Sequence, residues 1–284
     1  MGKYLKLFET HSEYLAFTQT EDFILPNVSY CEDNNEVHYN PYVDPYNGHA
    51  YVDLGLPSGT LWATKNVGAN NITDSGLYFS WGGTTGYTAA QVGTDKNFNW
   101  ADYELGDGQG GAAHMTKYNS TDGKTVLEAE DDAATVNMGG EWHMPSKEQL
   151  SELAANTKNG WVDANGVFTV YSWDEDYAEP TQTTVSGITT FSGTTGFLFF
   201  NENVSDIPAA LQSGEYVFFP AAGYCGGGSL FGVGGYGIVW SCSVNEDDLG
   251  NAWGVGFNSG GAEVGSDYRY VGLSVRGVVG ELTT

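Results

Sequence analysis

The fold of this chain is decided by the stretch from Val217 to Val278, which reads VFFPAAGYCGGGSLFGVGGYGIVWSCSVNEDDLGNAWGVGFNSGGAEVGSDYRYVGLSVRGV. Short apolar and aromatic runs, namely VFFPAAG, GIVWSCS, AWGVGF and GLSVRGV, alternate with segments rich in Gly, Ser, Asn and Asp. Runs of this length between turn residues predict β-strands, and the small residues between them predict connecting loops. No acid, base or nucleophile constellation recurs here. The pattern therefore favours a rigid β scaffold that displays loops for binding over an enzyme active site.

The composition of the whole chain is typical of a turn-rich β protein. Its 284 residues include 40 glycines, and 14% are aromatic. The formal net charge of −26 argues against direct binding to nucleic acid or to an anionic membrane surface, because both need a basic patch. We interpret the acidity as a source of solubility, with divalent-cation sites as the alternative.

The N-terminal residues lack the pattern of a secretory signal. The N-terminal MGKYLKLFETHSEYLAF has neither the apolar core nor the cleavage site of a signal peptide. No apolar run reaches the length of a membrane-spanning helix, so we expect no membrane insertion. We expect synthesis in a cytoplasm and, if the protein acts outside, release by another route such as lysis.

Residues 1–47 are predicted to form a separate small module. The expected elements are a strand over residues 4–8, a helix over 12–17, and two hairpin strands over 27–32 and 36–40. Asn34-Asn35 between the last two is a good two-residue hairpin turn. Such a module is too small for a full core, so we expect it to need a partner surface or an oligomer.

Residues 48–284 are predicted to form an α+β domain that is mostly antiparallel β with two short helices. The expected early strands lie at 51–56, 61–67 and 77–82, followed by a long surface loop over 87–119. The first helix should end at Gly139-Gly140, and the second should begin at Ser146 and stop near Asn156. The stretch 162–214 is expected to be β-like.

The order of the motifs carries a family resemblance over residues 50–280. In sequence order the motifs are YVDLGLPSGTLWATKNVGA, GLYFSWG, DAATVNMGGEWHMPSKEQLSEL, FFPAAGY, GYGIVWSCS, WGVGFNSGG and YRYVGLSVRGV. Together they resemble a C-type-lectin-fold domain of Bacteroidales, in the branch that is similar to formylglycine-generating enzymes and includes variable proteins of diversity-generating retroelements. The first 47 residues, with KYLKLFETHSEYLAF and PNVSYCEDNNEVHYNP, resemble the attachment module of Bacteroides phage and prophage virion proteins.

This resemblance implies a bacteriophage virion fibre or decoration protein, on the head or on the tail. Residues 1–47 would dock on other virion proteins, and the C-type-lectin-like domain would display a C-terminal face to a host surface glycan or protein. Relatives imply a homotrimer. Two alternatives stay open: a purely structural capsid or tail component, and an oxidase of the formylglycine-generating kind.

The predicted ligand-binding face consists of aromatic residues and one arginine near the C-terminus. Tyr and Phe in small-residue segments are rigid contact groups, and aromatic faces stack on sugar rings. We expect Arg269 to be exposed and available to an anionic ligand, and Arg276 to be structural. Trp62, Trp81, Trp142 and Trp240 are expected in the core. The predicted face comprises Tyr224, Phe231, Tyr236, Trp253, Tyr268, Arg269 and Tyr270.

The cysteines do not predict catalysis. Cys31, Cys225 and Cys242 form an odd set, which implies no disulfide framework, although Cys225 and Cys242 lie on neighbouring predicted strands and their pairing is open. Neither has a flanking base, and neither matches the catalytic cysteine pair of formylglycine-generating enzymes. We therefore predict no enzymatic activity and no catalytic residues.

No metal or cofactor site is predicted. The five histidines are scattered singly, without zinc-ligand spacing, and His143 before the second helix is expected to be structural. Glu246-Asp247-Asp248 is interpreted as a solvated acidic loop, with a calcium site as the alternative.

Overall fold

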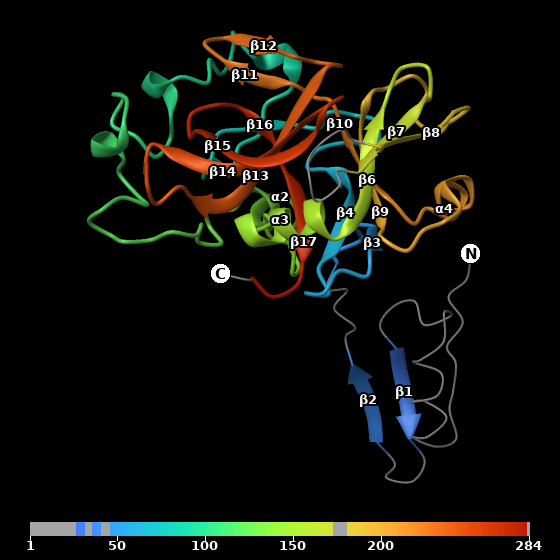
Figure 1. Ribbon diagram of the computed structural model, residues 1–284. Helices are drawn as coiled ribbons and strands as arrows, with labels where there is room; N and C mark the ends of the chain where they lie inside the picture. Colours follow the sequence, from blue (N-terminus) through green and yellow to red (C-terminus); the bar gives the residue numbers. More distant parts are fainter. Residues whose placement is uncertain (1–26, 32–35, 41–45, 173–180, 283–284) are drawn as a thin grey trace. The chain divides into compact units, whose positions relative to one another are not determined.

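A computed structural model describes residues 27–31, 36–40, 46–172 and 181–282 of the chain (Figure 1). The chain separates into two compact units, Met1–Gly48 and His49–Thr284.

The described part of the first unit is one antiparallel hairpin. Strand β1 (Asn27–Cys31) pairs with β2 (Glu36–Asn40) along its whole length. These strands confirm the expected hairpin, while its Asn34-Asn35 turn and the elements expected over 4–8 and 12–17 lie outside the described residues. An isolated two-stranded hairpin is marginally stable in water, so we expect the stability of this unit to depend on a partner. Its attachment role stays a prediction.

The C-terminal stretch of the second unit builds a five-stranded sheet in the order β15-β14-β13-β16-β5. All neighbours pair antiparallel except β13 with β16, which are parallel. The strands are β5 (Tyr78–Phe79), β13 (Tyr236–Val244), β14 (Asn251–Asn258), β15 (Gly261–Tyr268) and β16 (Leu273–Ser274).

Strand β15 corrects the expectation that its Gly-rich sequence is a loop. It pairs with β14 along its whole length, from Gly261 opposite Asn258 to Tyr268 opposite Asn251. Its Ala262 and Val264 side chains also pack against the core. Pairing and packing together outweigh the weak strand preference of Gly, Ser and Asp.

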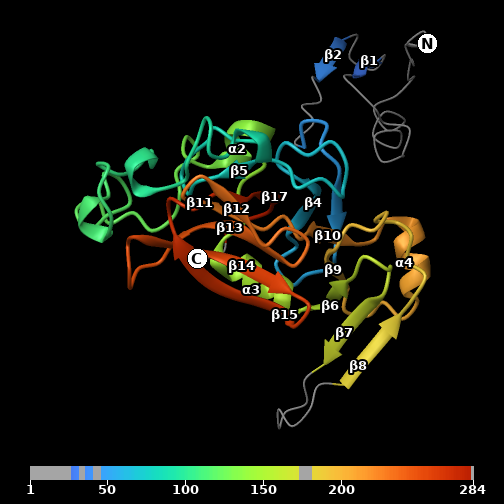
Figure 2. The same cartoon turned by 90° about the horizontal axis from the view of Figure 1, so that it is seen from above.

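A second five-stranded sheet is antiparallel throughout, in the order β10-β9-β6-β7-β8. Its strands are β6 (Thr157–Val162), β7 (Phe168–Ser172), β8 (Thr181–Val185), β9 (Gly196–Asn201) and β10 (Val217–Pro220). Seen from above, β15 of the first sheet lies next to β6 of the second (Figure 2). The two sheets therefore meet where β15, an edge strand of the first sheet, lies beside β6, the middle strand of the second.

Two smaller sheets complete the β structure. A three-stranded sheet in the order β17-β4-β3 contains β3 (Tyr51–Asp53), β4 (Leu61–Asn66) and β17 (Arg276–Val279). A two-stranded hairpin contains β11 (Tyr224–Gly226) and β12 (Ser229–Phe231). The unit is thus mostly antiparallel β with few helices, as expected for its fold class.

Three α-helices occur among the described residues, one more than expected. Helix α2 (Ala133–Met138) begins after the N-cap Asp132 and ends at Gly139, whose φ of 69° favours glycine. Helix α3 (Lys147–Ala155) begins after Ser146 and ends at Asn156, as predicted, and Ser146 forms a capping box with Gln149. The additional helix is α4 (Ile207–Ser213), which is capped by the Asp206 side chain and lies in the stretch expected to be β-like.

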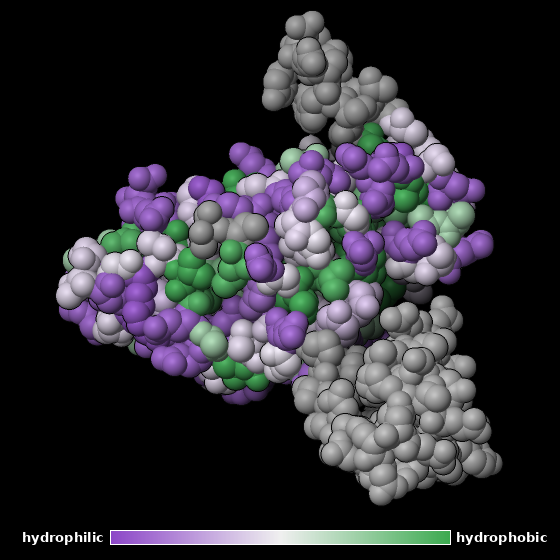
Figure 3. Space-filling model, turned by 90° about the horizontal axis from the view of Figure 1, so that it is seen from below, coloured by the Kyte–Doolittle hydropathy of each residue, from purple (hydrophilic) through white to green (hydrophobic). Residues whose placement is uncertain are grey.

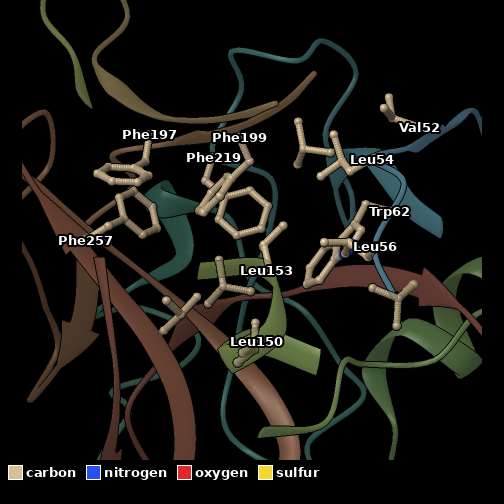
Figure 4. Packing of buried hydrophobic residues seen from close by; sticks show 14 of the residues in the cluster. Val52, Leu54, Leu56, Trp62, Leu150, Leu153, Phe197, Phe199, Phe219 and Phe257 are labelled. Carbon is tan, nitrogen blue, oxygen red and sulfur yellow. The ribbon is translucent and has the colours of Figure 1, made fainter. Parts of the chain in front are cut away.

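The main core lies where the two five-stranded sheets, α3 and β4 meet (Figure 4). Phe219 of β10 packs against Phe199 of β9 and Phe257 of β14, with ring centroids 5.1 and 5.9 Å apart. Leu150 and Leu153 reach this cluster from α3 and are fully buried. Burial of each such side chain contributes about 1.5–3 kcal/mol. The expected core tryptophans, Trp62, Trp81, Trp142 and Trp240, are all buried.

Arg276 connects three parts of this core by hydrogen bonds rather than by an ion pair. Its fully buried guanidinium donates to Asn66 Oδ1 at 3.0 Å and to the backbone oxygens of Ala63 and Phe218, both at 2.7 Å. Burial lowers the pKa of Arg276 to about 9. The residue is structural, as expected.

The long connection between β5 and α2 contains the short 3-10 turns η1 (Ala89–Gln91), η2 (Trp100–Asp102) and η3 (Ala112–His114). It is not purely a surface loop, because Phe98, Tyr103 and Tyr118 are buried. On the face shown in Figure 3, hydrophobic residues lie in separate patches between hydrophilic ones. None of the helices in the described ranges has the length and apolar character that crossing a membrane requires.

Candidate functional site

Two of the predicted site residues form a ring pair on the β11–β12 hairpin. Tyr224 and Phe231 are directly opposite each other, and their rings stack with centroids 5.4 Å apart and planes 27° apart. Phe231 is 46% exposed and Tyr224 is half-buried. The pair therefore offers an accessible aromatic surface on a strand hairpin rather than on a loop.

Glycines fix the position of this hairpin. Gly223 has a φ of 70°, and a Cβ there would lie 2.0 Å from the backbone oxygen of Phe231. At the turn, the N–H groups of Gly227 and Gly228 donate to the backbone oxygens of Phe98 and Asn97 at 3.1 and 2.7 Å. The hairpin is thus tied to the long loop by its backbone, at positions that favour glycine.

A second aromatic cluster joins the end of β15 to the long loop. Tyr268 and Tyr270 stack with centroids 5.6 Å apart and planes 12° apart. Trp100 of η2 meets both rings edge-on, at 5.9 Å from Tyr268 and 4.7 Å from Tyr270. Tyr268 is half exposed. Two of the four predicted tyrosines, Tyr268 and Tyr270, are therefore brought together, with Trp100 as a third member.

Trp100 was missed because it lies far from the C-terminal stretch, in a segment expected to be only a loop. One local signal marks its position: Asn99 caps η2 by accepting from the N–H groups of Ala101 and Asp102. That signal predicts a turn but no contact with Tyr268, which depends on the tertiary fold.

Tyr236, the remaining predicted tyrosine, lines a cleft of about 830 Å³ between β13–β15 and β6–β7. Its side chain lies across Gly256 of β14, where an added Cβ would come within 2.5 Å of its hydroxyl oxygen. The cleft has a volume in the range of ligand-binding sites. Its charged lining residues are Lys158, Glu202, Glu263 and Asp267.

Asp267 precedes Tyr268 of the second aromatic cluster and lines the cleft together with Tyr236. Burial raises the pKa of its carboxyl group, and the hydrogen bond that Oδ1 accepts from the Tyr268 N–H at 2.7 Å opposes this increase. Burial also raises the pKa of Tyr236 and of Tyr270, and the negative charge of Asp267 adds to both increases. The two hydroxyl groups thus remain protonated at neutral pH beside a half-buried carboxylate.

Arg269 corrects the expectation of an exposed cation. It is fully buried, and its Nε donates to the Tyr103 hydroxyl at 2.9 Å. Its terminal nitrogens donate to the backbone oxygens of Tyr118, Leu249 and Lys117 at 3.0 to 3.1 Å. The guanidinium also stacks over Trp81, 4.5 Å from the ring centre. Because all of its donors face inward, Arg269 is not available to an anionic ligand.

Within the described residues, no ring contact joins Trp253 to either aromatic cluster. Its ring is half-buried and has the ammonium of Lys147 at 3.7 Å from its centre. Neighbouring residues of β14 alternate between the two faces of the sheet, so Gly254 lines the cleft while Trp253 points away from it. Trp253 is therefore better explained as packing beside α3.

Cys225 and Cys242 are both buried and are free thiols. Burial raises the pKa of Cys225 to about 12 and also raises that of Cys242. Both groups stay protonated at neutral pH, and a thiol in this state is a poor nucleophile.

His143 and several acidic groups are engaged in structural contacts. His143 bonds to the backbone oxygens of Met144 and Gly280 at 2.8 and 3.0 Å. In the predicted acidic loop, Asp248 accepts a hydrogen bond from the Gly250 N–H at 3.0 Å. The carboxylates of Glu128, Glu130 and Asp131 lie within 4.8 Å of one another, and Lys117 forms ion pairs with all three.

No family model, curated protein or solved structure matches this chain.

Proposed function

We propose that this protein is a non-catalytic virion fibre or decoration protein that displays a binding face on a C-type-lectin-like domain. Residues 1–47 attach it to other virion proteins, and the C-terminal unit binds a host surface glycan or protein. The motif order over residues 50–280 and the resemblance of the first 47 residues to virion attachment modules support this proposal.

One observation carries the proposal: two accessible ring clusters are held on a rigid β scaffold. Tyr224 and Phe231 are fixed by the pairing of β11 with β12 and by the backbone hydrogen bonds of the hairpin turn to the long loop. Tyr268 and Tyr270 are held against Trp100 of the long loop, and the side chain of Arg269 between them bonds to backbone oxygens of the same loop. Aromatic side chains that are already ordered lose little conformational entropy on binding, and they contribute large contact areas. Many copies on one particle would strengthen a weak individual site by avidity.

A first experiment tests the attachment half of the proposal. Particles should be assembled with the full chain or with a variant that lacks residues 1–47, and their protein content compared. We expect the truncated chain to fold, because the core residues lie in the second unit, and to be absent from particles. Its incorporation at the level of the full chain would refute the attachment role.

A second experiment tests the binding half. Particles that carry the full chain should bind host cells. The double variant Tyr224→Ala/Phe231→Ala and the single variant Trp100→Ala should each weaken this binding. If none of these variants changes host binding, the aromatic face does not bind the host. The protein would then be a purely structural component.

A further inference from the structure

The burial of Arg269 changes the expected charge of the ligand. Because its guanidinium donates only to protein oxygens, no arginine is left for an anion near the aromatic clusters. The cleft beside them is lined by three carboxylates, Glu202, Glu263 and Asp267, and by one ammonium, that of Lys158. Its charge therefore repels anions.

The charged groups of the cleft do not neutralise one another. Lys158 is half-buried, and its ammonium donates to the backbone oxygen of Val204. None of the three carboxylates forms an ion pair with another residue in the part of the chain that the structure describes. Asp267 is half-buried and accepts one hydrogen bond, from the Tyr268 N–H to Oδ1. A half-buried carboxylate without a cation gains more from a charged partner than an exposed one does.

The floor of the cleft is flat because glycines replace side chains there. Gly254 and Gly265 are directly opposite each other on β14 and β15, and both line the cleft. A Cβ added at Gly265 would meet no atom within 4 Å, so the space above this position is open. Tyr236 forms a wall beside this open floor by lying across Gly256. A flat floor with an aromatic wall suits a ring-shaped ligand.

We propose that this cleft binds a protonated amino sugar, with its ammonium group paired to Asp267 and its ring lying over Gly254 and Gly265 against Tyr236. This inference rests on the proposed function, because it specifies the class of host glycan that the binding face takes. Pairing with carboxylates supplies charge-assisted hydrogen bonds, and the tyrosine ring covers the carbon atoms of the sugar.

The test compares three soluble probes on the full chain by isothermal titration calorimetry, at a pH where free amines are protonated and carboxyls are ionised. The probes are a glucosamine tetramer, an N-acetylglucosamine tetramer of the same length, and a lysine tetrapeptide. We expect the glucosamine tetramer to bind, and its affinity to fall as the salt concentration rises. The N-acetylated tetramer, which has the same ring without the charge, should bind at least about tenfold more weakly.

Three variants locate the binding in the cleft. Asp267→Asn should weaken glucosamine binding by about tenfold or more, since it removes the charge and keeps the shape. Gly265→Leu should abolish binding by filling the open floor. Glu141→Gln removes one charge from an exposed residue that does not line the cleft, and should change nothing. Melting temperatures of all variants confirm that each is folded.

Three results would overturn the inference. Equal affinities for the two tetramers, or unchanged affinity in Asp267→Asn, would show that the cleft does not select a cation. If the lysine tetrapeptide binds more tightly than the glucosamine tetramer, the ligand of the cleft is a basic peptide and not an amino sugar. If none of the three probes binds, the cleft is not a binding site for a cationic ligand. None of these results touches the proposed function, whose binding half fails if the Tyr224, Phe231 and Trp100 variants leave host binding intact and whose attachment half is tested by the truncation of residues 1–47.

Discussion

The guanidinium of Arg269 donates a hydrogen bond to the hydroxyl of Tyr103 over 2.9 Å, and both side chains are buried. Tyr103 in turn donates to the backbone oxygen of Trp81 at 2.8 Å. This chain of contacts fastens the long loop to the end of β15. It also sets the position of Trp100, whose ring lies 5.9 Å from that of Tyr103.

Replacing Arg269 by leucine should therefore destabilise the second unit. The substitution leaves the backbone oxygens of Lys117, Tyr118 and Leu249 without these donors, and we expect a loss of about 3–5 kcal/mol in the free energy of unfolding. Urea unfolding measures the change. Lys124→Ala is the control, because it breaks an exposed ion pair with Glu128 and should cost at most about 1 kcal/mol. Equal unfolding midpoints for the two variants would contradict the anchoring role of Arg269.

Asp267→Asn should increase stability at neutral pH. Burial raises the folded-state pKa of Asp267 above its unfolded value, so the folded protein binds the proton more tightly than the unfolded chain does. Ionised Asp267 thus destabilises the fold above its folded pKa, and this cost disappears as the pH falls through that pKa towards the unfolded value. Thermal unfolding over a pH series should show the stability advantage of the variant shrinking with acid. A variant that is less stable than the wild type at neutral pH would argue against an unfavourable burial of this carboxylate.

The aromatic clusters should contribute to binding more than to folding. We expect Tyr268→Ala and Phe231→Ala each to weaken host-cell binding by about tenfold, the effect of losing an interface residue worth more than 1 kcal/mol. Tyr51→Ala is a matched control, because Tyr51 is 43% exposed on β3, in a different sheet. A cell-binding assay with purified chain measures all three. Similar binding losses in the control would indicate a general loss of folding rather than a site.

The buried thiols should be unreactive in the folded protein. In a Cys31→Ser background, a thiol reagent such as DTNB should label Cys225 and Cys242 only after denaturant is added, because the reactive thiolate is suppressed by their raised pKa values. Absorbance at the reagent's product wavelength follows the reaction. Rapid labelling without denaturant would mean that at least one thiol is accessible and ionised.

Much of the scaffold could be predicted from local sequence signals. Helix α3 follows from the capping pattern Ser146 to Gln149 with Leu150 and Leu153 on one face, and α2 from its Gly139 end. Strands β13 and β14 follow from their apolar runs. Each of these signals lies within a few residues of the element that it specifies.

The remaining features depend on contacts between distant residues. Strand β15 is a strand because β14 pairs with it, although its own sequence is typical of a loop. The burial of Arg269 depends on Tyr103 and Tyr118, which are more than 150 residues away along the chain. The approach of Trp100 to Tyr268 has the same origin. Periodicity and spacing carry no information on such pairings, so the cleft carboxylates were not predicted either.

Electron cryomicroscopy of intact particles that carry this protein locates both units at once. We expect density for residues 1–47 against the particle, and the C-terminal unit outside it with Phe231 and Tyr268 facing solvent. A map in which these two aromatic residues are packed against other particle proteins would contradict a host-binding face, as would a map in which residues 1–47 make no contact with the particle.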